Sequence, residues 1–133
     1  MPGPTSDRPL VQVFGFDNDR ATRAALRFFK ERREPISFVE LGRRPIAPGE
    51  LRRFTERLGA RSLVDTEGAA YRDAGLAYLR LDDGELVARL LSDQRLLRLP
   101  LVRRGTEVTA GAADSTWKAW LAAGSAKGGI LGP

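Results

Sequence analysis

Asp19 is an acidic side chain at a position where it could do chemistry. It follows Phe16-Asp17-Asn18, a predicted turn, and precedes a predicted helix, so its carboxylate lies beside amides that have no partner within the helix. Such a carboxylate can act as a nucleophile or general base, or it can cap the helix by accepting a hydrogen bond from one of those amides. Aspartate is so common at helix starts that capping, by Asp19 or by Asn18, is the favoured interpretation.

Basic side chains gather in two places. On the predicted helix they share one stripe, which suits an acidic partner, a phosphate or simply solvent, and a solvated face is the simplest interpretation. This stripe consists of Arg20, Arg23, Arg27 and Lys30. A second group, which can contact a ligand or a protein partner, lies around Pro100 and the segment after it: Arg98, Arg103 and Arg104. The candidate binding residues are therefore Asp19, Arg20, Arg23, Arg98, Pro100 and Arg103.

Two absences from the composition restrict the possible mechanisms. The 133 residues include no cysteine and no histidine. There is consequently no disulfide, no thiolate nucleophile and no zinc–thiolate cluster, and the commonest general base and metal ligand is missing as well. Ser–His–Asp, Cys–His and histidine-based zinc mechanisms are excluded, and no metal or other cofactor is predicted. The net charge of +5 is only a weak argument for nucleic acid, which we do not expect as a partner.

Other polar or aromatic groups have sufficient structural explanations. Asp82-Asp83-Gly84 is typical of a turn rather than of a metal site. Tyr71-Arg72 is better explained by packing than by chemistry. Trp117 and Trp120 are three residues apart and share a helix face, so at least one of them is expected in the core.

The apolar pattern predicts the elements that position these side chains. Residues 10–14 form an apolar run that ends at Gly15, which indicates a buried strand. A helix is predicted over residues 20–33 and is broken by Pro35, and residues 36–41 alternate as in a second strand. These elements form a β-α-β unit, with the crossover expected to be right-handed.

The rest of the chain predicts a helical block and a hairpin. A loop over 42–48 leads to a helix over 48–58, capped by Gly59, and to short helical pieces at 62–65, 74–81 and 85–91. Strands at 100–103 and 106–110 flank the turn Arg104-Gly105, and Asp114 or Ser115 caps a last helix. The order β-α-β, helical block, β-β-α predicts an α/β, thioredoxin-like fold with a four-stranded mixed sheet.

This order also predicts the division of the chain. One domain is expected over residues 10–121, with a helical insertion at about 42–99, between a flexible N-terminus at 1–9 and a disordered tail at 122–133. No apolar run approaches the roughly 20 residues of a membrane span, and residues 1–9 do not resemble a secretion signal. Because a chain without cysteine suits a reducing compartment, a cytoplasmic location is expected.

Four segments, in this order and at this spacing, resemble the arsenate reductase and Spx regulator family. They are Val13-Phe14-Gly15, residues 51–72 with Leu58-Gly59 and Tyr71-Arg72, residues 96–102 around Leu99-Pro100-Leu101-Val102, and residues 111–115 before the last helix. In that family, a cysteine four residues after the loop glycine attacks arsenate, and the start of the helix favours its thiolate.

The resemblance implies that this chain has lost that chemistry. The cysteine position is occupied by Asp19, the arginine expected before the proline is Leu99, and a second anion-binding arginine falls near Asp65. Pro100 fits the family's cis-proline position, which is a feature of the backbone.

The leading functional hypothesis is a cysteine-less, non-redox member that acts as a protein-interaction or regulatory module. Members of the Spx branch bind RNA polymerase, so a redox-insensitive role of that kind is one form of this hypothesis. The alternatives are an enzyme of another class, or an anion-binding activity, at Asp19 and Pro100, and an accessory subunit of a reductase. The identity of the partner and the oligomeric state stay open.

Overall fold

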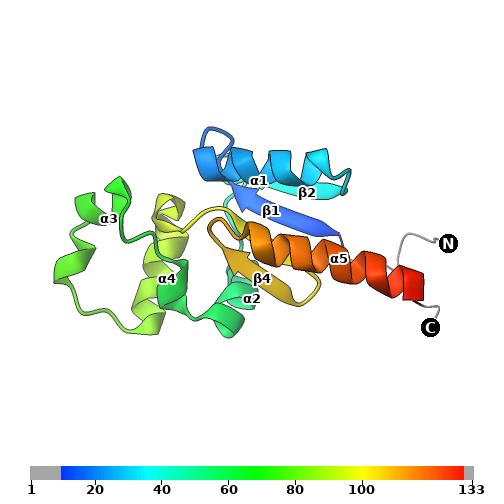
Figure 1. The fold of residues 1–133 in the computed structure, drawn as a ribbon. Helices are drawn as coiled ribbons and strands as arrows, with labels where there is room; N and C mark the ends of the chain where they lie inside the picture. The colour runs from blue at the N-terminus through cyan, green and yellow to red at the C-terminus, as the bar shows by residue number, and fades with distance from the viewer. Residues whose placement is uncertain (1–9, 131–133) are drawn as a thin grey trace.

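Four strands form a single mixed sheet at the centre of the molecule (Figure 1). In the computed structural model, which describes residues 10–130 and the side chains of 10–122, their order is β2-β1-β3-β4. The strands are β1 (Val11–Gly15), β2 (Ile36–Glu40), β3 (Leu101–Arg104) and β4 (Glu107–Ala110). β1 pairs in parallel with β2 and antiparallel with β3, which pairs antiparallel with β4. The predicted mixed four-stranded sheet is confirmed.

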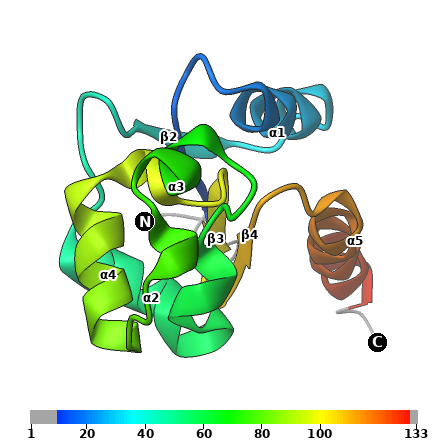
Figure 2. The ribbon, with the colours of Figure 1, turned by 90° about the vertical axis from the view of Figure 1, so that its left-hand side faces the viewer.

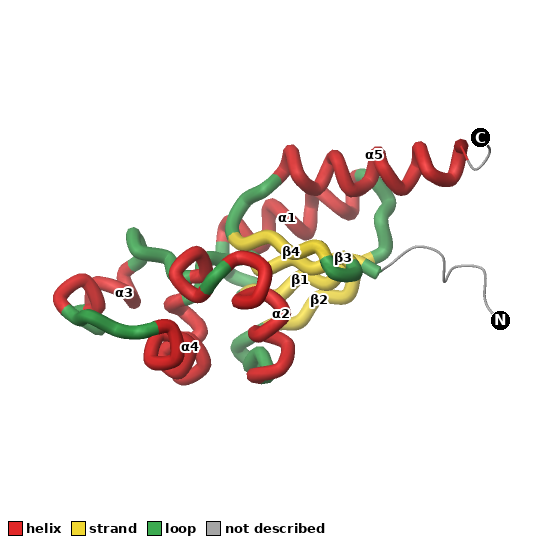
Figure 3. The backbone as a smooth tube through the Cα atoms, turned by 90° about the horizontal axis from the view of Figure 1, so that it is seen from below, coloured by secondary structure: helices red, strands yellow, loops and turns green. Residues whose placement is uncertain are grey.

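Helices cover both faces of this sheet, as Figure 3 shows from below. On one face lie α1 (Arg20–Glu31) and α5 (Asp114–Ile130), and on the other lies α2 (Pro48–Leu58). Because side chains alternate along a strand, Val11 and Val13 of β1 join the core under α1 and α5, while Phe14 joins the core under α2. The sheet therefore separates two apolar cores.

Aromatic packing fixes α1 and α5 on their shared face. Trp117 is fully buried against Phe28 and Phe29, with ring centroids 5.4 and 5.3 Å apart. Its indole Nε1 donates a hydrogen bond to Thr109 Oγ1 on β4 at 2.9 Å, which satisfies a donor that would be costly to bury alone. Trp120 is also buried, so both tryptophans belong to the core as their spacing suggested.

The helical insertion extends beyond one end of the sheet (Figures 1 and 2). It contains η2 (Ala60–Leu63), α3 (Ala69–Asp73), η3 (Leu76–Tyr78), α4 (Asp83–Ser92) and η4 (Gln94–Leu96). The buried amide of Gln94 accepts from the Ile46 amide at 2.8 Å and donates to the Ile46 carbonyl at 3.4 Å. A side chain from the end of the insertion thus holds the loop that begins it.

Several elements differ in extent from the prediction. α1 ends at Glu31 rather than at residue 33, because Arg33 has a φ of 55° and leaves the helical conformation. Only η3 forms within 74–81, since Gly75 takes a left-handed conformation and interrupts the helix. α4 begins earlier because Asp82 and Glu85 form a capping box.

The C-terminal helix differs most from the prediction. α5 runs to Ile130, so most of the segment expected as a disordered tail at 122–133 lies in the helix. Residues 131–133, like the N-terminal 1–9, lie outside the described residues. No helix within 10–130 is long and apolar enough to cross a membrane.

Candidate functional site

Asp19 is the N-cap of α1, as the sequence suggested. The backbone at Asp19 is extended, and one carboxylate oxygen, Oδ2, accepts from both the amide and the hydroxyl of Thr22 at 2.8 Å. Thr22 is fully buried, so this contact fixes the carboxylate of Asp19 at the start of the helix. Oδ1 of Asp19 has no hydrogen-bond partner among the described residues and remains available to a ligand.

Gly15, at the end of β1, brings the strand and the helix together. A Cβ atom added at this glycine would lie 2.2 Å from Thr22 Oγ1, which is closer than atoms can approach. The side chain of Thr22 therefore fills the space that the glycine leaves empty. This contact places the start of α1, and with it Asp19, directly over the end of the strand.

A surface cavity of about 670 Å³ lies beside this helix start. Its charged lining combines two carboxylates, Asp19 and Asp65, with two guanidinium groups, Arg95 and Arg98. Its other lining residues are Phe16, Asn18, Ala21, Leu97, Leu99, Ala110, Gly111 and Ala112. Four separate segments of the chain thus meet at one cavity.

Backbone pairing between two segments of the insertion holds Asp65 and Arg98 in the wall of this cavity. Val64 and Leu97 form an antiparallel bridge, the amide of Asp65 donates to the Leu96 carbonyl at 2.8 Å, and that of Arg98 donates to the Leu63 carbonyl at 2.7 Å. The cavity is therefore built partly from the insertion.

The two arginines of the cavity differ in their state. Arg95 donates to both carboxylate oxygens of Asp93, at 3.0 and 2.9 Å, and these bonds lower the pKa of the Asp93 carboxyl below its ordinary value. Arg98 has no side-chain hydrogen bond or ion pair with the residues whose side chains the structure describes, 10–122. Arg98 is thus the cation of this cavity that is free to meet a ligand.

Pro100 adjoins the cavity, because it follows the lining residue Leu99 and is hydrogen-bonded to the lining residue Gly111. The Leu99–Pro100 peptide bond is cis, as the resemblance implied, and the Pro100 carbonyl accepts from the Gly111 amide at 3.0 Å. Gly111 has a φ of 80°, and a Cβ there would lie 2.9 Å from Cδ of Arg98. The stem of Arg98 therefore rests on a residue that must lack a side chain.

Of the candidate residues, Asp19 and Arg98 line the cavity and Pro100 supports it. Arg20 and Arg23 are exposed on α1 and do not line the cavity.

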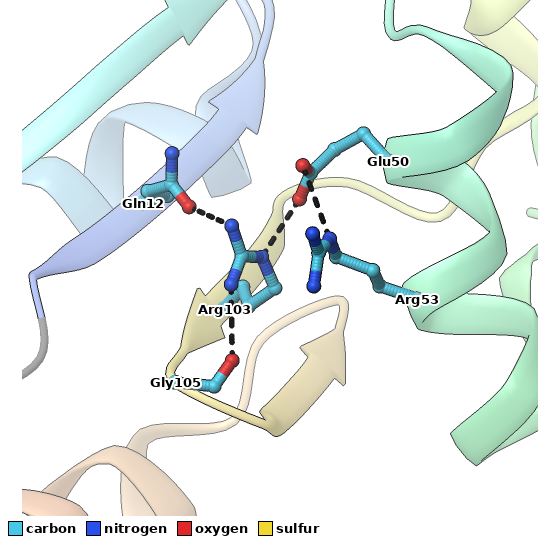
Figure 4. A network of polar contacts seen from close by, with 5 residues as sticks. All are labelled: Gln12, Glu50, Arg53, Arg103 and Gly105. Atoms are coloured by element: carbon cyan, nitrogen blue, oxygen red, sulfur yellow. Dashed lines mark hydrogen bonds and ion pairs between the residues drawn. The ribbon is translucent and has the colours of Figure 1, made fainter.

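Arg103 lies elsewhere, on the sheet face under α2 (Figure 4). Its side chain is 17% exposed, and it donates to Glu50 at 2.7 Å, to the Gly105 carbonyl at 3.0 Å and to Gln12. Its guanidinium is thus engaged in hydrogen bonds within the protein.

The sequence interpretation missed Arg95 as a lining residue. The signal was its position three residues before Arg98 in the segment that leads to Pro100. Among the side chains that the structure describes, in residues 10–122, no cluster of three or more acids is arranged to hold a metal ion, and the sequence contains no cysteine or histidine.

Comparison with known proteins agrees with the fold that the structure shows. The family model described as the ArsC family matches residues 14–120, which include the end of β1, the insertion, the cis-proline and both tryptophans. The chain belongs to the ArsC family. No curated protein sequence gives a significant match.

Solved structures show that the ArsC fold is retained almost completely. The YFFB protein superposes with a TM-score of 0.78 at 17% identity, covering 84% of this chain and 98% of its own. The arsenate reductase from Vibrio cholerae gives 0.71 at 17% identity, covering 81% and 94%. The arsenate reductase (ArsC) related protein from Brucella melitensis gives 0.64 at 16% identity, covering 84% and 94%. The predicted thioredoxin-like fold is confirmed, in an ArsC-family chain that has no cysteine.

Proposed function

We propose that this chain is a non-redox ArsC-family protein that binds a protein partner and does not reduce arsenate. The observation that supports this most is the state of Asp19. It stands where the resemblance places the nucleophilic cysteine, and its carboxylate caps α1 through Thr22. The chain has the fold of the family, but its sequence contains no cysteine that could carry out the family's thiol chemistry.

The charge of the cavity also opposes the family reaction. A carboxylate cannot form an arsenylated or glutathionylated sulfur, and Asp19 and Asp65 would both repel an incoming oxyanion. A like-charge pair about 4 Å apart near a protein surface costs on the order of 4 kcal/mol. The Leu99 side chain adds no cation at the position before Pro100.

Binding, by contrast, needs only what the cavity retains. Its volume of about 670 Å³ is enough for side chains of a partner, and Arg98 and Oδ1 of Asp19 offer a free donor group and a free acceptor. A partner segment that carries both polar and apolar groups fits this lining best. We propose that this interaction takes place in the cytoplasm, because a chain without cysteine suits a reducing compartment.

The first test is an arsenate reductase assay with glutathione and glutaredoxin. We expect no turnover from the natural chain, and little from Asp19→Cys because Leu99 and Asp65 still stand where the family has arginines. The arsenate reductase from Vibrio cholerae serves as the active control. Measurable turnover by the natural chain would overturn the proposal.

The second test concerns the transcriptional form of the proposal, which follows from the resemblance to the Spx branch. Purified RNA polymerase is passed over the immobilised chain at low salt, with Arg98→Gln as the variant and Arg80→Gln, an exposed arginine outside the cavity, as its control. Retention that Arg98→Gln weakens and Arg80→Gln does not would support this form. Absence of retention removes polymerase as the partner.

Anion binding by an enzyme of another class is the second candidate, and the free guanidinium of Arg98 favours it. Calorimetric titration with phosphate or sulfate, again comparing Arg98→Gln with Arg80→Gln, tests it directly. Heat of binding that depends on Arg98 would favour this candidate over the protein-binding one. The absence of such heat eliminates it.

A further inference from the structure

The outer face of α1 carries a row of cations that no part of the described chain covers. Arg20, Arg23, Arg27 and Lys30 are all exposed, and at roughly 100° per residue they share one narrow side of the helix. The buried residues Thr22, Ala25, Phe28 and Phe29 lie on the opposite side. α1 lies at the edge of the molecule in both ribbon views (Figures 1 and 2). We call these four cations the α1 stripe.

No acidic side chain described, in residues 10–122, forms an ion pair with the α1 stripe. None of its four side chains takes part in an ion pair or side-chain hydrogen bond there, and the first turn of the helix contains no acid. Glu31, the acid of this helix, contacts Arg32 at 4.0 Å. Arg32 itself turns away onto the ring of Phe28, 3.8 Å from its centre.

This arrangement is unfavourable for the helix alone. Like charges three and four residues apart repel each other, and Arg20 and Arg23 lie near the positive end of the helix dipole. A row of carboxylates placed along the stripe would remove both penalties. The charge pattern therefore favours an acidic partner over plain exposure to solvent.

The length of the stripe indicates what kind of acidic partner fits. Arg20 and Lys30 are ten residues apart, which is about 15 Å along a helix. The exposed carboxylates of Asp17 and Glu31 lie just before and just after it. A duplex nucleic acid carries charge continuously, about one per 1.7 Å, and would meet these acids as well. An acidic segment no longer than the stripe would not extend to the carboxylates of Asp17 and Glu31.

We infer that the α1 stripe is a docking surface for an acidic α-helix of a partner protein, with carboxylates spaced at i, i+3, i+7 and i+10. This inference rests on the proposed binding function, since it names the chemistry of the partner. It concerns a surface outside the cavity at Asp19, so the two can be tested separately.

The test uses a fluorescent alanine-based helical peptide with glutamates at those spacings and a matched peptide with glutamines. Arg23→Gln/Arg27→Gln is compared with Arg52→Gln/Arg80→Gln, which removes the same charge from exposed sites on other segments. Removing two exposed ion pairs should weaken binding by about tenfold. The control variant should bind like the natural chain, and binding should weaken between about 50 and 200 mM salt.

Two outcomes would overturn the inference. The first is equal weakening by both double variants, which would mean attraction to net charge alone. The second is a duplex oligonucleotide that binds more tightly than the glutamate peptide at the same salt and also depends on Arg23 and Arg27. Either result leaves the cavity and its Arg98 tests unaffected, so failure here is distinguishable from failure of the proposed function.

Discussion

Asp19 stabilises the fold at the position where the resemblance places the family's cysteine. One oxygen of its carboxylate accepts two hydrogen bonds from Thr22, and the amide would otherwise have no partner at the helix start. Asp19→Ala should therefore lower the free energy of unfolding by about 1 kcal/mol. Asp19→Asn keeps an accepting oxygen and should lose much less. Urea unfolding of the two variants measures the difference, and equal losses would contradict the capping role.

Asp93 gives the stability a predictable dependence on pH. Its pKa is lowered by the hydrogen bonds from Arg95, so its contribution is present above the ordinary value of 3.8 and is lost as the pH falls through the lowered value. Asp93→Asn should be slightly less stable than the natural chain at pH 7. The difference should vanish when the two are compared in strong acid. A difference that persists there would assign the effect to packing.

Single residues differ in how well the sequence alone predicted them. The cap at Asp19 and the cis bond at Pro100 depend on neighbours along the chain, so local pattern and resemblance were sufficient. The occupied state of Arg103 depends on Glu50, 53 residues away. No local pattern predicts such a pairing.

At the scale of elements, Arg103 joins β3 to α2. Its bond to Glu50 at 2.7 Å links the sheet to the helix that covers it, and both side chains are mostly buried. Arg103→Met should leave the Glu50 carboxylate without its closest partner and cost about 1–3 kcal/mol.

Arg53 provides the matched control, because it meets the same carboxylate at 3.6 Å from a side chain that is 59% exposed. Arg53→Met should cost less than about 1 kcal/mol. Chemical unfolding of both variants checks this pair of predictions. Similar losses would show that Glu50 is stabilised by charge alone and not by the bond to β3.

Elements with a strong period were predicted well, and short ones were not. The strands and the helices at 20–31 and 48–58 follow from apolar spacing and caps. The insertion consists of short turns whose extent depends on local backbone details such as the left-handed Gly75. The cavity depends on pairing between Val64 and Leu97, which no periodic pattern reveals.

At the scale of the molecule, the central sheet and the insertion should differ in local stability. β1 is paired on both sides and is largely buried, whereas α3 contains no buried residue and Tyr78 in η3 is 92% exposed. Amide hydrogen exchange should therefore be slowest in β1 and β3 and fast in α3 and η3. Equal protection in both regions would mean that the insertion unfolds only together with the sheet.

The contact between Asp19 and Thr22 also bears on whether a cysteine could arise at this position. A change from Asp19 to cysteine removes the cap, at a cost of about 1 kcal/mol, before any arginine at positions 65 or 99 could make a thiol useful. A chain that changes Asp19 first would therefore be less stable than the present one. The cap thus opposes the appearance of a cysteine at position 19, because fold stability depends on the carboxylate that is present there.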